Sequence, residues 1–252
     1  MVTVFGPAGV GKTRLVREAL RRLEKGRHDV GVVATACPSG GAAAPWSSAI
    51  ALIGALCGLG AGADDDRLLE AAARLRALGV TDDDADGVLA AIGTAPGAAI
   101  DEPRDGNLVA RAFARAIRSL CRDRAHVFAW DAAEALDAWT ADALADLADE
   151  RDGLRALVVL ASREAPLASF ARDDHHLALE LGELDLDDTA RLIAARLGAR
   201  VVPANVLAAC RARGGGAPRA LEDAARELVA AGAITLQDGV AALDAERASA
   251  GS

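Results

Sequence analysis

The chain has 252 residues, with 28 Lys and Arg against 37 Asp and Glu, so its formal net charge at pH 7 is −9. Hydrophobic residues make up 52% and charged residues 26% of the sequence, a composition typical of a globular protein that excludes intrinsic disorder. The acidic pI near 5.0 argues against binding nucleic acid through a basic surface, because such binding neutralises phosphates with cations.

The sequence also lacks the patterns of membrane and secreted proteins. Its most apolar run, residues 50–59, is interrupted by glycine and too short to span a bilayer. The N-terminus has neither the basic nor the apolar part of a secretory signal. The four cysteines are far apart, without a CxxC pair, which favours reduced thiols over a zinc site. We therefore expect a cytoplasmic protein.

The N-terminal pattern predicts the opening of a parallel α/β sheet. Residues 2–5 form a short apolar strand, which stops at the Gly-rich segment GPAGVGKT. An amphipathic helix follows and ends at Gly26, and residues 29–37 form an apolar run of strand length. A strand, loop, helix and strand in this order are typical of an α/β fold.

The next segment, residues 38–106, is predicted to be a helical insertion with loops. A helix is expected to start near Pro45. The acidic runs at 64–66 and 82–84 are expected on solvated faces and at helix N-termini. Asn107 is the predicted N-cap of the helix that follows.

The rest of the chain changes from strands to helices. Strands are predicted at 126–131, 156–163 and 176–184, with a helix at 139–150, and helices at 187–198, 203–214 and 218–232. Asp238 and Gly239 indicate a hairpin turn within residues 233–243, and the tail from 246 to 252 is expected to be frayed. We expect a doubly wound parallel α/β core over 1–184 that includes the insertion, a helical subdomain over 185–232, and a hairpin with a tail over 233–252.

The Gly-rich segment matches the P-loop pattern G-x-x-x-x-G-K-[ST]. Its glycines let backbone N–H groups surround a phosphate, and the following helix directs its positive end at that charge. The predicted nucleotide-binding residues are Gly6, Pro7, Ala8, Gly9, Val10, Gly11, Lys12, Thr13 and Arg14. Lys12 is expected to contact the β- and γ-phosphate oxygens, and the Thr13 hydroxyl to bind Mg²⁺.

Two later strands end in residues suited to the same chemistry. Asp131 follows an apolar strand, where a carboxylate can hold Mg²⁺ directly or through water; the alternative is an Asp that caps the next helix. Arg163 ends the next strand, near the expected position of a γ-phosphate, and its alternative role is that of an ordinary surface residue. Pro218 by itself indicates only the first turn of a helix.

The order of these motifs resembles the nucleotide-binding core of the STAND class of signal-transduction ATPases, in particular the AAA-type ATPase domain of large LuxR-type and other bacterial signalling proteins. GPAGVGKTRLV is similar to the first motif of the family, HVFAWDAAEALDAWT to the second and ALVVLASRE to the sensor strand. LGELDLDDTARLIAARLG resembles the opening of the helical subdomain. The segment that starts at GGGAPRAL resembles the Gly-x-Pro helix with the first winged-helix hairpin.

The resemblance implies ATP and Mg²⁺ as cofactors, with Lys12 and Thr13 at the phosphates, Asp131 at Mg²⁺, Arg163 as γ-phosphate sensor and Pro218 against adenine. By the same resemblance the chain, which opens at the P-loop strand and stops within the hairpin, looks like an excised or degenerate module of this family. The second acid of the family, which is expected to polarise the attacking water, is replaced here by Ala132. Hydrolysis is therefore expected to be slow, unless Glu134 substitutes for the missing acid.

The expected function is an ATP/Mg²⁺-binding signalling switch with weak hydrolase activity and a role in transcription regulation. Its partners would be ATP or ADP and other domains or proteins, with nucleotide-dependent self-association, but neither membrane nor nucleic acid. The alternatives are a competent NTPase or small-molecule kinase, a scaffold that binds no nucleotide, and an origin-recognition-type AAA ATPase acting on DNA. A GTPase is disfavoured because no NKxD motif occurs.

Overall fold

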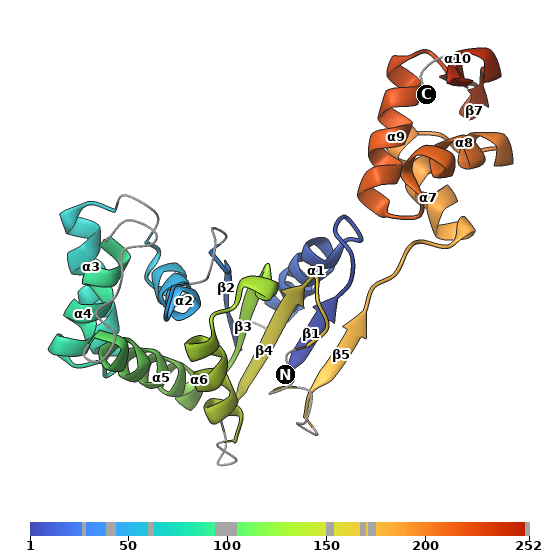
Figure 1. Cartoon of the computed structure of the whole chain (residues 1–252). Helices are drawn as coiled ribbons and strands as arrows, with labels where there is room; N and C mark the ends of the chain where they lie inside the picture. The colour runs from blue at the N-terminus through green and yellow to red at the C-terminus, as the bar shows by residue number, and fades with distance from the viewer. Residues whose placement is uncertain are drawn as a thin grey trace. The chain divides into compact units, whose positions relative to one another are not determined.

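The structure is a computed structural model that describes residues 1–26, 29–38, 44–59, 63–93, 105–149, 154–166, 170 and 175–249 (Figure 1). These residues form two compact units. The first contains residues 1–5 and 13–179, and the second contains residues 6–12 together with 180–252.

The first unit is built on a five-stranded sheet with the order β2-β3-β4-β1-β5. The strands are β1 (Val2–Phe5), β2 (Val30–Ala36), β3 (Ala125–Asp131), β4 (Ala156–Ser162) and β5 (Leu177–Glu180). The β2–β3, β3–β4 and β4–β1 pairs are parallel, so their carboxyl ends meet at one edge of the sheet. This arrangement confirms the predicted P-loop type of α/β core.

Most helices of the first unit form one core with one face of the sheet. They are α2 (Ser47–Cys57), α3 (Asp65–Ala77), α4 (Asp82–Gly93), α5 (Asp105–Asp123) and α6 (Ala138–Asp149), whereas α1 (Lys12–Gly26) follows the Gly-rich loop. Phe128 and Trp130 of β3 are almost fully buried against this helical layer, together with Phe113 of α5 and Leu144 of α6. The predicted helical insertion is thus largely part of the main core.

Two details of this region differ from the prediction. Helix α5 begins at Asp105, so Asn107 lies inside the helix and does not cap it. Asp64 does cap α3, with its side chain accepting a hydrogen bond from the N–H of Arg67 at 3.0 Å. Asp84 lies in the first turn of α4, as expected of this acidic run, but it is only 1% exposed and so is not solvated.

The second unit has a core of its own. Its elements are α7 (Leu186–Leu197), α8 (Ala204–Gly214), α9 (Pro218–Ala230), β6 (Ile234–Gln237), β7 (Val240–Leu243) and α10 (Ala245–Ser249). Buried side chains of the three longer helices, including Ile193, Cys210 and Leu221, pack together with Ile234 of β6. The chain also forms a β-bridge between Val201 and β7.

The hairpin prediction is confirmed, because β6 and β7 pair antiparallel around Asp238 and Gly239. Both turn residues have positive φ, 51° and 78°, as a two-residue type I′ turn requires. The predictions for the end of the fifth strand and for the C-terminal tail are wrong. Strand β5 ends at Glu180 rather than at residue 184, and residues expected to fray form α10, where Ala248 accepts a hydrogen bond from Arg213.

Candidate functional site

The Gly-rich loop has the backbone of a phosphate-binding loop. Gly6, Gly9 and Gly11 all have positive φ, at 146°, 80° and 105°, a region that other residues rarely adopt. The Lys12 ammonium group donates hydrogen bonds to the carbonyl oxygens of Gly6 at 2.7 Å and Pro7 at 2.8 Å. The loop thus curls around the side chain that is expected to contact phosphate.

The next residue, Thr13, contacts the end of β3. Its Oγ1 donates a hydrogen bond of 3.0 Å to Oδ1 of Asp131, which also accepts the N–H of Ala132 at 3.0 Å. The strand end is fixed by a 2.8 Å hydrogen bond from the N–H of Cys37 to the Asp131 carbonyl. The two side chains predicted to bind the metal are therefore in contact, although they are 118 residues apart in sequence.

The contacting atoms suit Mg²⁺, which prefers hard oxygen ligands in octahedral geometry and usually keeps several waters. A hydroxyl and a carboxylate, completed by phosphate oxygens and water, provide such a set. Among the described residues, no three His, Cys, Asp or Glu side chains are arranged around one metal position.

The two remaining catalytic candidates are paired with each other. Glu134 accepts the backbone N–H of Arg163 at 3.0 Å, and its other carboxylate oxygen lies 3.1 Å from the Arg163 Nε. The guanidinium-bearing side chain is 68% exposed. Between β3 and the short 3₁₀ helix η1 (Ala133–Ala135), Ala132 adopts a left-handed conformation with φ of 54°.

The last acid of the second motif, Asp137, has a capping role that the motif analysis did not predict. Asp137 is 2% exposed, and its carboxylate accepts hydrogen bonds from the N–H groups of Trp46 at 3.0 Å, Ser48 at 2.9 Å and Thr140 at 2.9 Å. It therefore binds the N-terminal turns of α2 and α6 together. The spacing Asp137-x-x-Thr140 before an apolar helix is the sequence signal that could have revealed the capping role.

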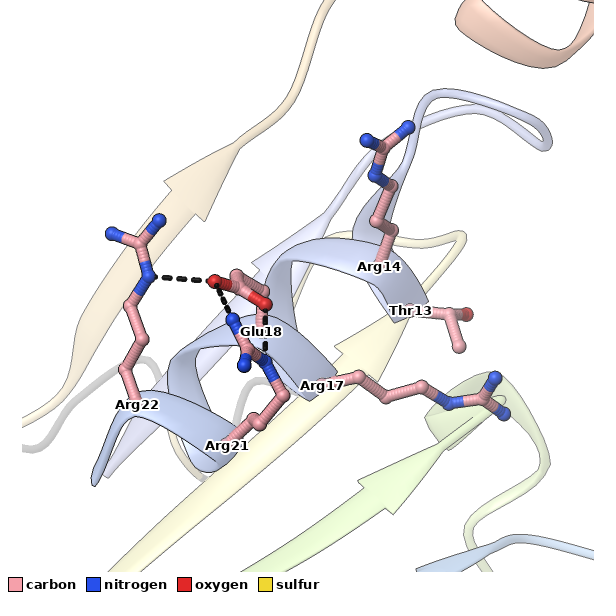
Figure 2. Close-up of a pocket in the computed structure, with 6 residues that line it drawn as sticks. All are labelled: Thr13, Arg14, Arg17, Glu18, Arg21 and Arg22. Carbon is pink, nitrogen blue, oxygen red and sulfur yellow. Dashed lines mark hydrogen bonds and ion pairs between the residues drawn. The ribbon is translucent and has the colours of Figure 1, made fainter. Parts of the chain in front are cut away.

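Two further predicted residues lie at helix starts. Arg14 is exposed in the first turn of α1, beside Thr13 (Figure 2). Pro218 is the first residue of α9. Within the second unit, the N–H of Arg219 donates a 3.2 Å hydrogen bond to the carbonyl of Gly9, so the start of α9 contacts the Gly-rich loop.

The cysteines have no direct part in this site. All four are free thiols. Burial raises the pKa of the Cys37 thiol, the one that follows β2, to about 11, so the thiol is protonated at neutral pH. A protonated, buried thiol is neither a good nucleophile nor a good metal ligand.

Fold and site together define a P-loop nucleotide-binding domain. The family model of the AAA ATPase domain matches residues 1–160. The chain belongs to this AAA ATPase family. A second model, described as a domain of unknown function (DUF8739), matches residues 186–242, which is most of the second unit.

Other comparisons add little to this assignment. No curated protein matches the chain. A solved structure described as "Structure of Drosophila ORC bound to DNA" is similar with a TM-score of 0.43 and 19% sequence identity. The similarity covers 78% of this chain and 41% of the other, so the present chain spans less than half of that protein.

In the described part of the chain, no helix combines the length and apolarity needed to cross a bilayer.

Proposed function

We propose that the chain is the ATP- and Mg²⁺-binding switch of a STAND-type signalling ATPase, and that it hydrolyses ATP slowly. The observation that carries the proposal is the 3.0 Å contact between Thr13 and Asp131, next to a complete P-loop sequence and directly before Ala132. The Thr13–Asp131 contact is suited to binding Mg²⁺, and the P-loop is suited to binding nucleotide. Ala132 stands where the family has a second acid.

Nucleotide binding would use the loop and the two metal ligands. The backbone N–H groups of the loop and the Lys12 ammonium would surround the β- and γ-phosphates, while Thr13 and Asp131 would hold the metal. Bound Mg²⁺ neutralises charge on the phosphate oxygens. No covalent chemistry is asked of the protein in these steps, only positioning and electrostatic stabilisation.

Hydrolysis requires a further group that orients or deprotonates a water molecule. Ala132 has no such group, and the nearest candidate, Glu134, has its carboxylate engaged by Arg163. General acid–base assistance is typically worth about 10²–10⁴-fold in rate. We therefore expect bound ATP to stay unhydrolysed long enough for the ATP-bound state to act as a signal.

The second unit would report this state. The start of α9 contacts the Gly-rich loop through Gly9 and Arg219, which supports placing Pro218 against the adenine, as the STAND resemblance implies. Contacts that Arg163 makes with a γ-phosphate would exist with ATP and be lost with ADP. Other domains or partner proteins, or a second copy of the chain, would respond to the difference.

Isothermal titration with ATP, ADP and GTP, each with and without Mg²⁺, tests the proposal. The expected result is binding of adenine nucleotides that Mg²⁺ strengthens for ATP, with GTP much weaker. Equal affinity for GTP would contradict an adenine-specific switch. Absence of binding by every nucleotide would instead favour a protein-interaction scaffold.

A further inference from the structure

The two faces of the sheet are covered very differently. Phe128 and Trp130 are buried beneath α2, α5 and α6, whereas α1 contributes no residue to that core and has no buried residue of its own. Because side chains alternate along a strand, Val127 and Ala129 lie on the opposite face, and so does Leu157 of β4, which pairs with Val127. Val127 and Ala129 are buried, whereas Leu157 is 38% exposed, so this face is covered over β3 and open at Leu157 of β4.

A groove runs along α1 on this face. It has a volume of about 300 Å³, and its floor includes small side chains from β2, β3 and β4, among them Ala34, Ala36 and Ala129. Thr13 and Asp131, the proposed Mg²⁺ ligands, also line the groove, which therefore adjoins the proposed nucleotide site. Val16 and Leu20 of α1 form its apolar wall. A floor of alanines leaves room for the larger apolar side chains of an incoming helix, which are held in hydrophobic grooves at spacings of three and four residues.

The arginine at the rim of this groove belongs to a cationic patch on α1. Arg17 lines the groove and also belongs to a row of exposed arginines on α1, with Arg14, Arg21 and Arg22 (Figure 2). Helix α1 carries six cationic side chains and two acidic ones, although the whole chain has a net charge of −9. The patch is thus opposite in sign to the rest of the molecule.

The arginines are partly held in position. Glu18 lies 2.8 Å from Arg21 and 2.7 Å from Arg22, and hydrogen bonds from Arg21 and then Arg22 lower the pKa of its carboxyl to about 2. One carboxylate shared by two guanidinium groups leaves a net positive charge and restricts both side chains. Arg17 extends along the other side of α1, over the groove (Figure 2).

An apolar floor beside a cationic rim selects the chemistry of the ligand. Nucleic acid would pair with the arginines but would leave the apolar lining of the groove without a partner. Trp130, which also lines the groove, is 1% exposed and offers no ring on which a base could stack. An amphipathic helix with acidic residues along one side would use both parts of the surface. We propose that the groove between α1 and strands β2–β4 is the docking site of an acidic amphipathic helix from a partner protein.

The test uses a fluorescent synthetic helix of about 18 residues, five turns long, with leucines on one face and glutamates on the other. One control peptide replaces the glutamates by lysines, and a second keeps the glutamates but replaces the leucines by glutamines. Fluorescence anisotropy is expected to show a Kd on the order of 10 µM for the first peptide. Both controls are expected to bind at least about tenfold more weakly.

Variants of the protein locate the binding site. The double change Arg17→Glu and Arg21→Glu reverses the rim, and Ala34→Trp fills the groove without changing charge; each is expected to weaken binding about tenfold or more. Arg226→Glu on α9 removes an arginine of similar exposure elsewhere and is expected to have no effect. Thermal unfolding and circular dichroism of all variants verify that the domain remains folded.

Several outcomes would overturn the proposal. Equal binding of the acidic peptide without leucines would identify a general anion surface, for which nucleic acid or polyphosphate is the better ligand. Lack of binding by the acidic amphipathic helix, or binding that Arg17→Glu with Arg21→Glu leaves unchanged, would exclude this groove. Self-association in sedimentation velocity that the same double variant abolishes would assign the groove to a second copy of the chain.

Discussion

At the scale of single residues, the site depends on contacts between side chains far apart in sequence. Thr13 and Asp131 meet because β1 and β3 both end at the same edge of a parallel sheet, with β4 between them. The chemistry of each residue could be predicted from its local motif. The partnership between Glu134 and Arg163 could not, because each motif by itself gives its residue a separate role and only the register of β3 and β4 brings them together.

Lys12→Ala is expected to weaken ATP binding by at least about 10–100-fold, because charged hydrogen bonds contribute roughly 1.5–3 kcal/mol each. The stability of the Lys12→Ala variant should change little, since a cation outside the core contributes little to folding. Lys25→Ala is the matched control, because Lys25 lies in the last turn of the same helix. Calorimetric titration of both variants with Mg·ATP checks the prediction, and an unchanged affinity in a folded Lys12→Ala protein would contradict nucleotide binding by this loop.

Glu134→Gln removes the charge that faces Arg163. The Arg163 side chain is 68% exposed and the Glu134 side chain is 22% exposed, so water screens the pair and the free energy of unfolding should change by less than about 1 kcal/mol. The slow release of phosphate should also stay within about threefold of the native rate, well below the 10²-fold or larger effect of a general base. Loss of the residual turnover in this variant would identify Glu134 as the catalytic carboxylate.

At the scale of helices and strands, Asp137 connects α2 to α6. Asp137→Ala would leave the buried N–H groups of Trp46, Ser48 and Thr140 without their shared acceptor. The expected loss is about 2–4 kcal/mol in the free energy of unfolding. Asp142→Ala, an exposed position on α6, should remain within about 0.5 kcal/mol. Urea unfolding of the two variants compares them directly, and equal stabilities would exclude this capping role.

Asp84 connects α4 to α5. Burial alone would raise the pKa of this carboxyl, but hydrogen bonds from Arg111 and Thr81 and the charges of Arg111 and Arg115 outweigh burial and lower the pKa. The ion pair with Arg111 has an N···O distance of 2.6 Å. Because the folded pKa is lower than the unfolded value near 3.9, the stabilisation is present above about pH 4 and is lost as the pH falls through the folded pKa.

Asp84→Asn should therefore lower stability at pH 7 and flatten its decline below about pH 4. Asp83→Asn, at the exposed neighbouring position, should keep the native pH profile. Chemical unfolding between pH 2.5 and 7 distinguishes the two variants. An unchanged acid profile in Asp84→Asn would show that other carboxylates cause the acid sensitivity.

The elements were predictable where local patterns are strong. The glycine-rich loop between an apolar strand and an amphipathic helix indicated β1 and α1, and the Asp238-Gly239 pair indicated the hairpin. The acidic run around Asp84 suggested a solvated surface, because the arginines that permit its burial lie on α5, more than 25 residues later. The tail helix α10 was missed because its contacts come from α8 and the second core rather than from its own sequence.

At the scale of the whole molecule, the order of motifs indicated the AAA ATPase family, which the match over residues 1–160 confirms. The division into units was less accessible from sequence. Residues 6–12 of the Gly-rich loop belong with residues 180–252, and the loop touches α9 through Arg219. The contact between the loop and α9 joins residues far apart in sequence, so no local pattern predicts it. We expect bound nucleotide to influence the second unit through this contact.

The central claim is that the chain binds Mg·ATP but lacks the acid for fast hydrolysis. Its most direct test is steady-state phosphate release at saturating Mg·ATP for the native chain, Ala132→Asp and Ala132→Asn. Asp and Asn both tolerate the left-handed backbone at this position, so they differ only in the carboxylate. We expect Ala132→Asp to raise the rate by about 10²-fold with little change in affinity, and Ala132→Asn to stay at the native rate. Rapid turnover by the native chain, unaffected by either substitution, would contradict the account.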